Sequence, residues 1–157
     1  MPVRRVVTEE RDGRSRIARD EQAPANEFWE DLWIIEPGDP TGRPATDTDA
    51  TLEPPEGTAR WRVFIVPTAQ RMREVMTGHV ADDAPDVEAP FHKTSTLDLI
   101  YVLDGEIDLV LDDGEVHLRP GDCVVQQHTN HAWRNLNDHP VRLLGLMTTL
   151  PASVTGP

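Results

Sequence analysis

From Leu97 onward the sequence consists of short apolar runs separated by residues typical of tight turns. The run LDLIYVL is followed by Asp104 and Gly105, and EIDLVL, in which apolar and polar residues alternate, ends shortly before Asp113 and Gly114. Asp-Gly pairs accept the backbone angles of hairpin turns, and a two-residue period is typical of strands with one buried face. Together with the preceding runs they predict about eight to ten strands, which suits an all-β fold of two packed sheets.

The N-terminal third is less regular. Residues 1–26 are charged and weakly patterned, and their valines predict no more than a short edge strand. FWEDLWII, at residues 28–35, is the first strongly apolar segment and predicts the first strand. Residues 36–59 are rich in proline, glycine, threonine and acidic side chains, so we expect a long surface loop there.

A strand and a short helix are predicted before the regular region. WRVFIV, at residues 61–66, predicts a strand that ends at Pro67. In residues 69–76 the apolar side chains recur at helical intervals, and Thr68 is suited to cap the helix. The polar residues 77–90 predict either a mobile lid over the mouth of a barrel or an exposed insertion without a catalytic part.

Length and charge limit what the chain can be. Its 157 residues, 38% of them hydrophobic, suffice for one domain, which we divide into an N-terminal arm, first strand and proline-rich loop (1–60) and a barrel (61–157). The net charge of -13, from 28 acidic and 15 basic residues, argues against nucleic acid and anionic membranes as partners. Cys123 is the only cysteine, so no intrachain disulfide can form. With no apolar signal core or spanning segment, we expect a cytoplasmic protein.

Two blocks, residues 92–105 and 114–135, carry histidines and an aspartate at a characteristic spacing. They read HKTSTLDLIYVLDG and GEVHLRPGDCVVQQHTNHAWRN. As patterns, HxTxxxDxxxxxxG and GxxxxxPGDxxxxxxxxHxxxN resemble the paired signature motifs of the cupin superfamily, small jelly rolls that hold one divalent metal in the barrel. The resemblance implies a double-stranded β-helix fold. It also implies a homodimer, since such barrels commonly pair. The run 97–103 agrees with this, because it is apolar on both faces and needs either a second protomer or the N-terminal arm to cover it.

A carboxylate at Asp98, in the middle of an apolar strand, must be paired, protonated or bound to a cation. The resemblance places His92, Asp98 and His131 at metal-ligand positions and Thr94 where a further histidine would stand. Two imidazoles and a carboxylate leave coordination positions open for substrate, water or oxygen, as suits one catalytic iron, manganese, nickel or zinc ion. In the alternatives, Asp98 reaches only a metal-bound water, or the three side chains merely hydrogen-bond one another.

Other residues near the motifs are candidates for contact with substrate. His128 stands where the cupin pattern has a glycine; it is either a solvated loop residue or a catalytic proton donor to the substrate or substitute ligand. Thr94, Trp133 and Asn135 are the candidate substrate-binding residues. For Trp133 a core-filling role, and for Asn135 a structural hydrogen bond, remain open.

The predicted function is that of a metal-dependent enzyme on a small oxygenated organic acid or aromatic polyketide-like compound. The variant details of both motifs resemble a subgroup of small cupins associated with secondary metabolism, which implies a decarboxylase or an oxygenase. Two alternatives remain. One is a non-catalytic barrel that binds a small ligand, and the other is a metal-free isomerase or cyclase that uses His92 and His131 as acid and base.

Overall fold

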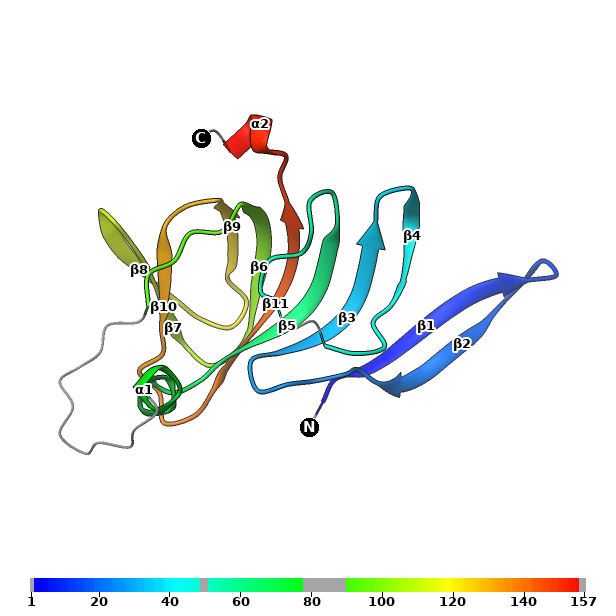
Figure 1. Ribbon diagram of the computed structural model, residues 1–157. Helices are drawn as coiled ribbons and strands as arrows, with labels where there is room; N and C mark the ends of the chain where they lie inside the picture. The colour runs from blue at the N-terminus through cyan, green and yellow to red at the C-terminus, as the bar shows by residue number, and fades with distance from the viewer. Residues whose placement is uncertain (1, 49–50, 78–89, 156–157) are drawn as a thin grey trace.

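The computed structural model describes residues 2–48, 51–77 and 90–155. A six-stranded sheet has the order β4-β3-β5-β11-β6-β9, a three-stranded sheet the order β10-β7-β8, and β1 and β2 pair separately. Figure 1 shows this last hairpin extending away from the barrel on the side of β3 and β4. The elements are β1 Arg4–Arg11, β2 Arg14–Gln22, β3 Trp29–Glu36, β4 Asp39–Pro44, β5 Ala59–Val66, α1 Ala69–Thr77, β6 Thr96–Asp104, β7 Ile107–Leu111, β8 Gly114–Leu118, β9 Cys123–Gln127, β10 His131–Arg134, β11 Val141–Thr149 and α2 Ala152–Thr155. The predicted all-β class is confirmed.

The main core lies between the two larger sheets and follows from strand alternation. Along β6 the even-numbered residues from 96 to 102 are buried, and along β11 the odd-numbered residues from 141 to 147 are buried. Because neighbouring side chains of a strand point to opposite faces, each strand gives one row to this core. The buried members are Ile100, Val102, Ile107, Leu109, Leu118, Val141 and Leu143.

The N-terminal part is more ordered than its sequence predicts. Residues 4–22 form a long hairpin instead of a short edge strand, and β4 pairs with β3 inside the segment predicted as a loop. Strands β2 and β4 have no buried residue and are largely polar, so they lack the hydrophobic alternation from which strands are predicted. A second small core of Ala23, Leu32 and Val63 covers part of the outer face of the six-stranded sheet.

The two Asp-Gly turns have different structures. Gly105 has a φ of +75°, and a β-carbon there would lie 2.6 Å from Val141, so glycine is required by both backbone and packing. In the second turn Gly114 already pairs with Leu111, and Asp112 and Asp113 form the turn. The hairpin prediction is confirmed, but the second glycine lies in the strand.

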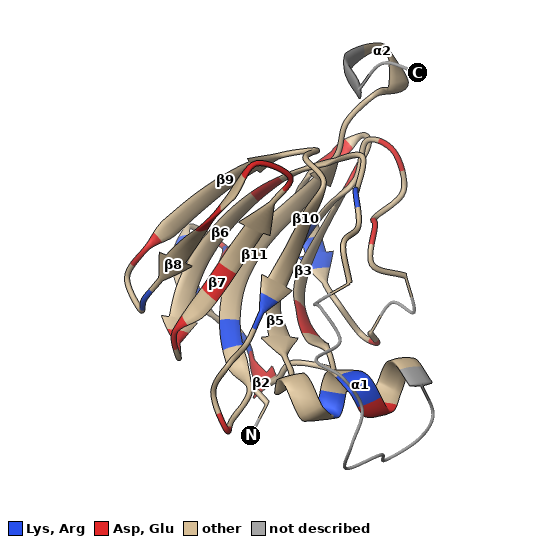
Figure 2. Cartoon of the chain, turned by 90° about the vertical axis from the view of Figure 1, so that its left-hand side faces the viewer, with Lys and Arg blue, Asp and Glu red and all other residues tan. Residues whose placement is uncertain are grey.

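The helix prediction is also confirmed. In α1 the backbone N–H of Arg71 donates to the Thr68 hydroxyl at 3.2 Å, which caps the first turn. Figure 2 shows α1 at the end of the barrel where β5 ends. None of the helices in the described part of the chain has the length and apolar character needed to cross a membrane. The lid predicted at 77–90 falls almost entirely on residues 78–89, which lie outside the described part.

The outer face of β6 and β9 is apolar and exposed. Its members are Leu99, Tyr101, Leu103 and Val125, between 37% and 61% exposed. The N-terminal segment covers the neighbouring region around Val63 and Leu144 but leaves these four uncovered. A homodimer that buries this face stays a prediction.

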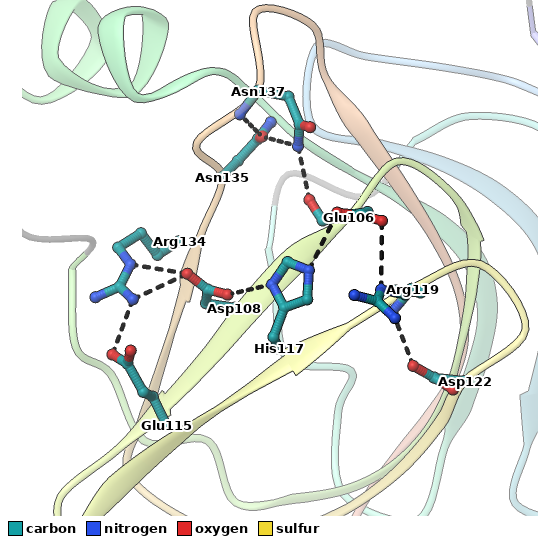
Figure 3. Close-up of polar contacts among 9 residues, drawn as sticks. All are labelled: Glu106, Asp108, Glu115, His117, Arg119, Asp122, Arg134, Asn135 and Asn137. Carbon is teal, nitrogen blue, oxygen red and sulfur yellow. Dashed lines mark hydrogen bonds and ion pairs between the residues drawn. The ribbon is translucent and has the colours of Figure 1, made fainter.

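An ionic network holds the outer face of the three-stranded sheet (Figure 3). Asp108 lies on the central strand and pairs across the sheet with His117 on one side and Arg134 on the other. Its carboxylate is 2.7 Å from His117 Nδ1 and accepts from Arg134 Nη2 at 2.9 Å. Hydrogen bonds to Asp108 and to Glu106 raise the pKa of His117. His117 is half-exposed and links β7 to β8.

We expect His117 to give the protein a pH-dependent stability. Because the pKa of His117 is raised in the folded state, its contribution is present below the ordinary histidine value of 6.5 and is lost as the pH rises through the raised value. The test compares the free energy of urea unfolding of wild type and His117→Gln between about pH 5.5 and about pH 8.5. In an Asp108→Asn background the same substitution should change this pH dependence much less. Identical pH profiles for wild type and His117→Gln would contradict the assignment.

Candidate metal and substrate site

A cavity of about 220 Å³ opens between the two sheets, and most of its wall is apolar. Polar side chains gather in one part of the wall, where strands β6, β9 and β10 meet the segment before β6. The polar lining residues are His92, Thr94, Asp98, Gln126 and His131. The apolar lining residues are Phe28, Trp29, Leu52, Phe64, Ile65, Val66, Pro67, Met72, Pro90, Ile100, Trp133, Leu143 and Met147. The cavity therefore suits a small apolar or aromatic molecule with a polar end.

Backbone pairing brings the two predicted histidine ligands together. His92 and His131 form an isolated antiparallel bridge, in which each N–H donates to the carbonyl of the other at 2.9 and 3.0 Å. Their ring centroids are 4.3 Å apart. The two residues are 39 positions apart in the sequence, so the bridge between their segments creates this part of the site.

A second cross-strand pair supplies the carboxylate. In the β6–β9 ladder Asp98 lies directly opposite Gln126, and both side chains are at least 96% buried. The Gln126 amide donates one N–H to Asp98 Oδ2 at 3.0 Å and lies 3.1 Å from His131 Nε2. Gln126 therefore connects the carboxylate to one imidazole.

The hydrogen bonds of both histidines leave Nε2 as the acceptor nitrogen. His92 Nδ1 is 3.1 Å from the carbonyl oxygen of Pro90, and His131 Nδ1 is 2.8 Å from that of Thr129. A carbonyl oxygen only accepts, so each Nδ1 carries a proton, and Nε2 is the nitrogen left to accept a hydrogen bond or bind a metal when the ring is neutral. Burial lowers the pKa of His131, which favours the neutral ring. Second-sphere bonds of this kind orient metal-binding histidines.

The charge of Asp98 is poorly compensated. Burial raises its pKa to about 6, and the opposing effects of the Thr96 hydroxyl and the Gln126 amide are smaller. Among the described residues, neither Oδ1 of Asp98 nor Oε1 of Gln126 has a hydrogen-bond partner. Two imidazoles, a carboxylate and an amide oxygen are a donor set that suits a divalent first-row transition metal. In the chemistry of their donor atoms the residues therefore fit such an ion.

The structure brings most, but not all, of the predicted site residues to the cavity. His92, Asp98, His131, Thr94 and Trp133 all line it. Within the described residues, however, no group of three or more His, Cys, Asp or Glu side chains lies close enough to hold a metal ion as it stands. The amide of Gln126 lies between the carboxylate of Asp98 and the ring of His131.

Two predicted residues lie elsewhere. The amide of Asn135 donates to the backbone carbonyls of Val66, Pro67 and His139, so it ties β5 to the β10–β11 connection and does not line the cavity. This corrects its assignment to substrate binding. His128 also lies outside the cavity lining, with a φ of +40° in the position where glycine was expected. The structure gives no support to its predicted role as catalytic proton donor.

Sequence reasoning missed Gln126. The signal was present, because alternation in CVVQQ directs the side chains of Val124 and Gln126 to one face. A buried amide on an apolar strand face needs partners just as a buried carboxylate does. What the sequence does not contain is the register that places Gln126 opposite Asp98.

The aromatic wall of the cavity is braced by a buried ion pair. Arg62, which is fully buried, donates from Nε to Asp31 Oδ1 at 2.8 Å and from Nη1 to the carbonyl of Leu52 at 3.0 Å. Its guanidinium also lies 5.0 Å from the ring centroid of Trp29 and 5.8 Å from that of Phe64. Three of these partners line the cavity, so Arg62 holds its wall in place from behind.

Comparison with known proteins agrees with this architecture. Residues 79–147 match the family model described as the cupin domain. The chain contains a cupin domain. The fold is also similar to that of the Schizosaccharomyces pombe Cnp3 cupin domain, with a TM-score of 0.53 and 10% identity, covering 98% of this chain and 93% of that one. At this identity the similarity concerns the fold alone.

Sequence relatives include fungal biosynthesis cluster proteins and fungal cupin-domain-containing oxidoreductases. A phomopsin biosynthesis cluster protein of Diaporthe leptostromiformis is 53% identical over 57 residues, which are 36% of this chain and 30% of the relative. A cupin-domain-containing oxidoreductase of Aspergillus ruber is 43% identical over 77 residues, covering 45% of this chain and 38% of the relative. The matches thus span about a third of the length of these relatives.

We expect the Arg62–Asp31 pair to be essential for stability. Arg62→Met removes the cation that is paired with the buried Asp31 carboxylate, and breaking a buried pair in this way costs about 3–5 kcal/mol. Arg43→Met is the matched control. It breaks the ion pair between Arg43 and Glu36, whose side chains are both half-exposed, and should cost about 0–1 kcal/mol. Urea unfolding monitored by circular dichroism measures both. Equal costs for the two substitutions would contradict the prediction.

His128 should be replaceable without loss of the site. His128→Gly suits the positive φ better and removes the imidazole, so we expect equal or slightly higher stability. Metal content and turnover should stay within about twofold of wild type, because the side chain does not line the cavity. A hundredfold loss of turnover in a folded, metal-loaded His128→Gly protein would restore the proton-donor role.

Proposed function

We propose that this chain is a metal-dependent cupin enzyme of the oxidoreductase type. Its substrate would be a small apolar or aromatic molecule with an oxygen-bearing end, such as an organic acid or a polyketide-like compound. The observation that carries the proposal is the polar part of the cavity, where His92, Asp98 and His131 line an otherwise apolar pocket. The names of several relatives, which call them cupin-domain-containing oxidoreductases, support oxidation over decarboxylation.

The protein side chains would divide the work between metal binding and substrate orientation. His92 and His131 would bind through Nε2, since each Nδ1 is held by a carbonyl, and Asp98 would supply the anionic ligand. A bound metal would supply Lewis-acid chemistry and, if it is iron, redox chemistry. Thr94, whose hydroxyl is 2.8 Å from that of Thr96, can offer a hydrogen bond to a substrate oxygen from the same wall.

The apolar wall would set the orientation of the substrate. Trp133, Phe64 and Trp29 line the cavity, and aromatic faces bind planar apolar groups. A substrate seated against them would turn its oxygen-bearing end toward the histidines, where a bound metal would attract it and the Thr94 hydroxyl could donate a hydrogen bond to it. Exclusion of water from such an apolar cavity strengthens the electrostatic interactions at its polar end.

A second candidate is a barrel that binds a small ligand without catalysis. One observation favours it: Gln126 already connects Asp98 with His131, so these side chains form a hydrogen-bonded group without an ion. In that case the polar side chains would serve recognition only. We also propose, on the sequence evidence given above, a cytoplasmic homodimer whose partners are small molecules.

The deciding experiment is metal analysis of the protein purified without a metal-chelating tag. We expect about one first-row transition metal per chain in the wild type and nearly none in His131→Ala, since removal of one of three protein ligands reduces affinity by about 100-fold or more. His139→Ala, which removes an exposed histidine outside the cavity, is the control and should retain the metal. A folded wild type that takes up none of the four predicted metals would refute the enzyme and favour the binding barrel.

A further inference from the structure

We propose that Gln126 is a fourth metal-binding side chain, which donates its amide oxygen to the same ion as His92, Asp98 and His131. This inference rests on the proposed function, because it presupposes that the cavity binds a divalent metal. It assigns to this chain a ligand set of two histidines, an aspartate and a glutamine. In this set Gln126, from β9, compensates for the threonine at position 94.

The first argument is the burial of an unused acceptor. Gln126 is 96% buried and lines the polar part of the cavity, yet its Oε1 has no hydrogen-bond partner among the described residues. Leaving a buried amide oxygen unpaired costs about 1–3 kcal/mol. Oδ1 of Asp98, on the neighbouring strand β6, also has no hydrogen-bond partner among the described residues. A cation bound by both side chains would satisfy two unpaired oxygens with one interaction.

The second argument is the position of the amide. Gln126 lies opposite Asp98 in the β6–β9 ladder, and its amide nitrogen is within 3.1 Å of both the Asp98 carboxylate and His131 Nε2. Asp98 and His131 are both proposed ligands, so the group that contacts both is close to any ion they share. A half-turn of the terminal amide exchanges its nitrogen and oxygen at little steric cost.

The third argument concerns the charge of the site. An amide oxygen adds no charge, so Gln126 can lie next to Asp98 in the metal-free protein and stabilise its carboxylate by donating a hydrogen bond. A second carboxylate in its place would repel Asp98 when no cation is bound. Glutamine therefore serves both states, as a donor to Asp98 without metal and as an acceptor toward the metal.

The test is a cobalt(II) titration of the metal-free protein, followed by visible absorption and by competition with a chelator. Four proteins are compared: wild type, Gln126→Leu, Gln126→Glu and Gln127→Leu. The last is the matched control, since it makes the same chemical change one residue along β9, where the side chain is exposed. Circular dichroism establishes that each variant is folded.

We expect Gln126→Leu to weaken cobalt binding by about tenfold or more and to shift the absorption bands. Loss of an outer-sphere partner alone weakens binding by about 10- to 100-fold, so the shift of the bands is the result that identifies a lost ligand. Gln126→Glu should bind cobalt about tenfold more tightly than wild type, because an anionic oxygen replaces a neutral one. Gln127→Leu should stay within about twofold of wild type in affinity, with an unchanged spectrum.

Two results would overturn the inference, and they differ from failure of the proposed function. A folded Gln126→Leu that binds cobalt with the spectrum of wild type, whatever its affinity, shows that Gln126 does not contact the metal. If Gln126→Leu does not fold, Gln126→Glu decides, and an affinity equal to that of wild type overturns the inference. A wild type that binds no cobalt refutes the metal site itself, whatever the variants do.

Discussion

A carboxylate buried in the middle of a core strand is the constraint on which the cavity depends. Asp98 lies among apolar side chains on the inner face of β6, and its hydrogen-bond partner comes from the neighbouring strand β9. Gln126 supplies that partner and extends the interaction to His131, whose backbone is bridged to His92. One cross-strand pair and one isolated bridge thus place four side chains with nitrogen and oxygen ligand atoms on one wall.

The other wall depends on a different kind of buried charge. Arg62 is paired with Asp31 across β3 and β5 and contacts the aromatic rings that line the cavity. The N-terminal segment therefore contributes to the site although its own hairpin extends away from the barrel (Figure 1). An apolar wall supported by an ion pair and a polar wall supported by cross-strand pairing give the cavity two chemically different ends. That polarity underlies the proposal of a substrate with a single oxygen-bearing end.

Much of the fold could be predicted because strand alternation and turn chemistry are local. The strand at 61–66, the helix capped by Thr68 and the hairpin at Gly105 follow from side-chain spacing and backbone preference. The hairpin of residues 4–22 and strand β4 could not, because both are largely exposed and show little apolar periodicity. Their pairing depends on backbone hydrogen bonds and on ion pairs between residues distant in sequence, such as Arg4 with Asp20.

The sequence alone determined which residues the site would be built from: the spacing of His92, Asp98 and His131 placed all three on the wall of one cavity. Tertiary structure decided what lies between them. The register of β6 and β9 put Gln126 opposite Asp98, and a shift of one residue would have turned the side chains of a strand to the other face of the sheet. The fold also placed Asn135 outside the cavity, where it binds backbone carbonyls. Register results from the packing of whole sheets, so no local pattern contains it. For that reason the sequence identified the candidate ligands, while only the folded chain showed the amide that joins them.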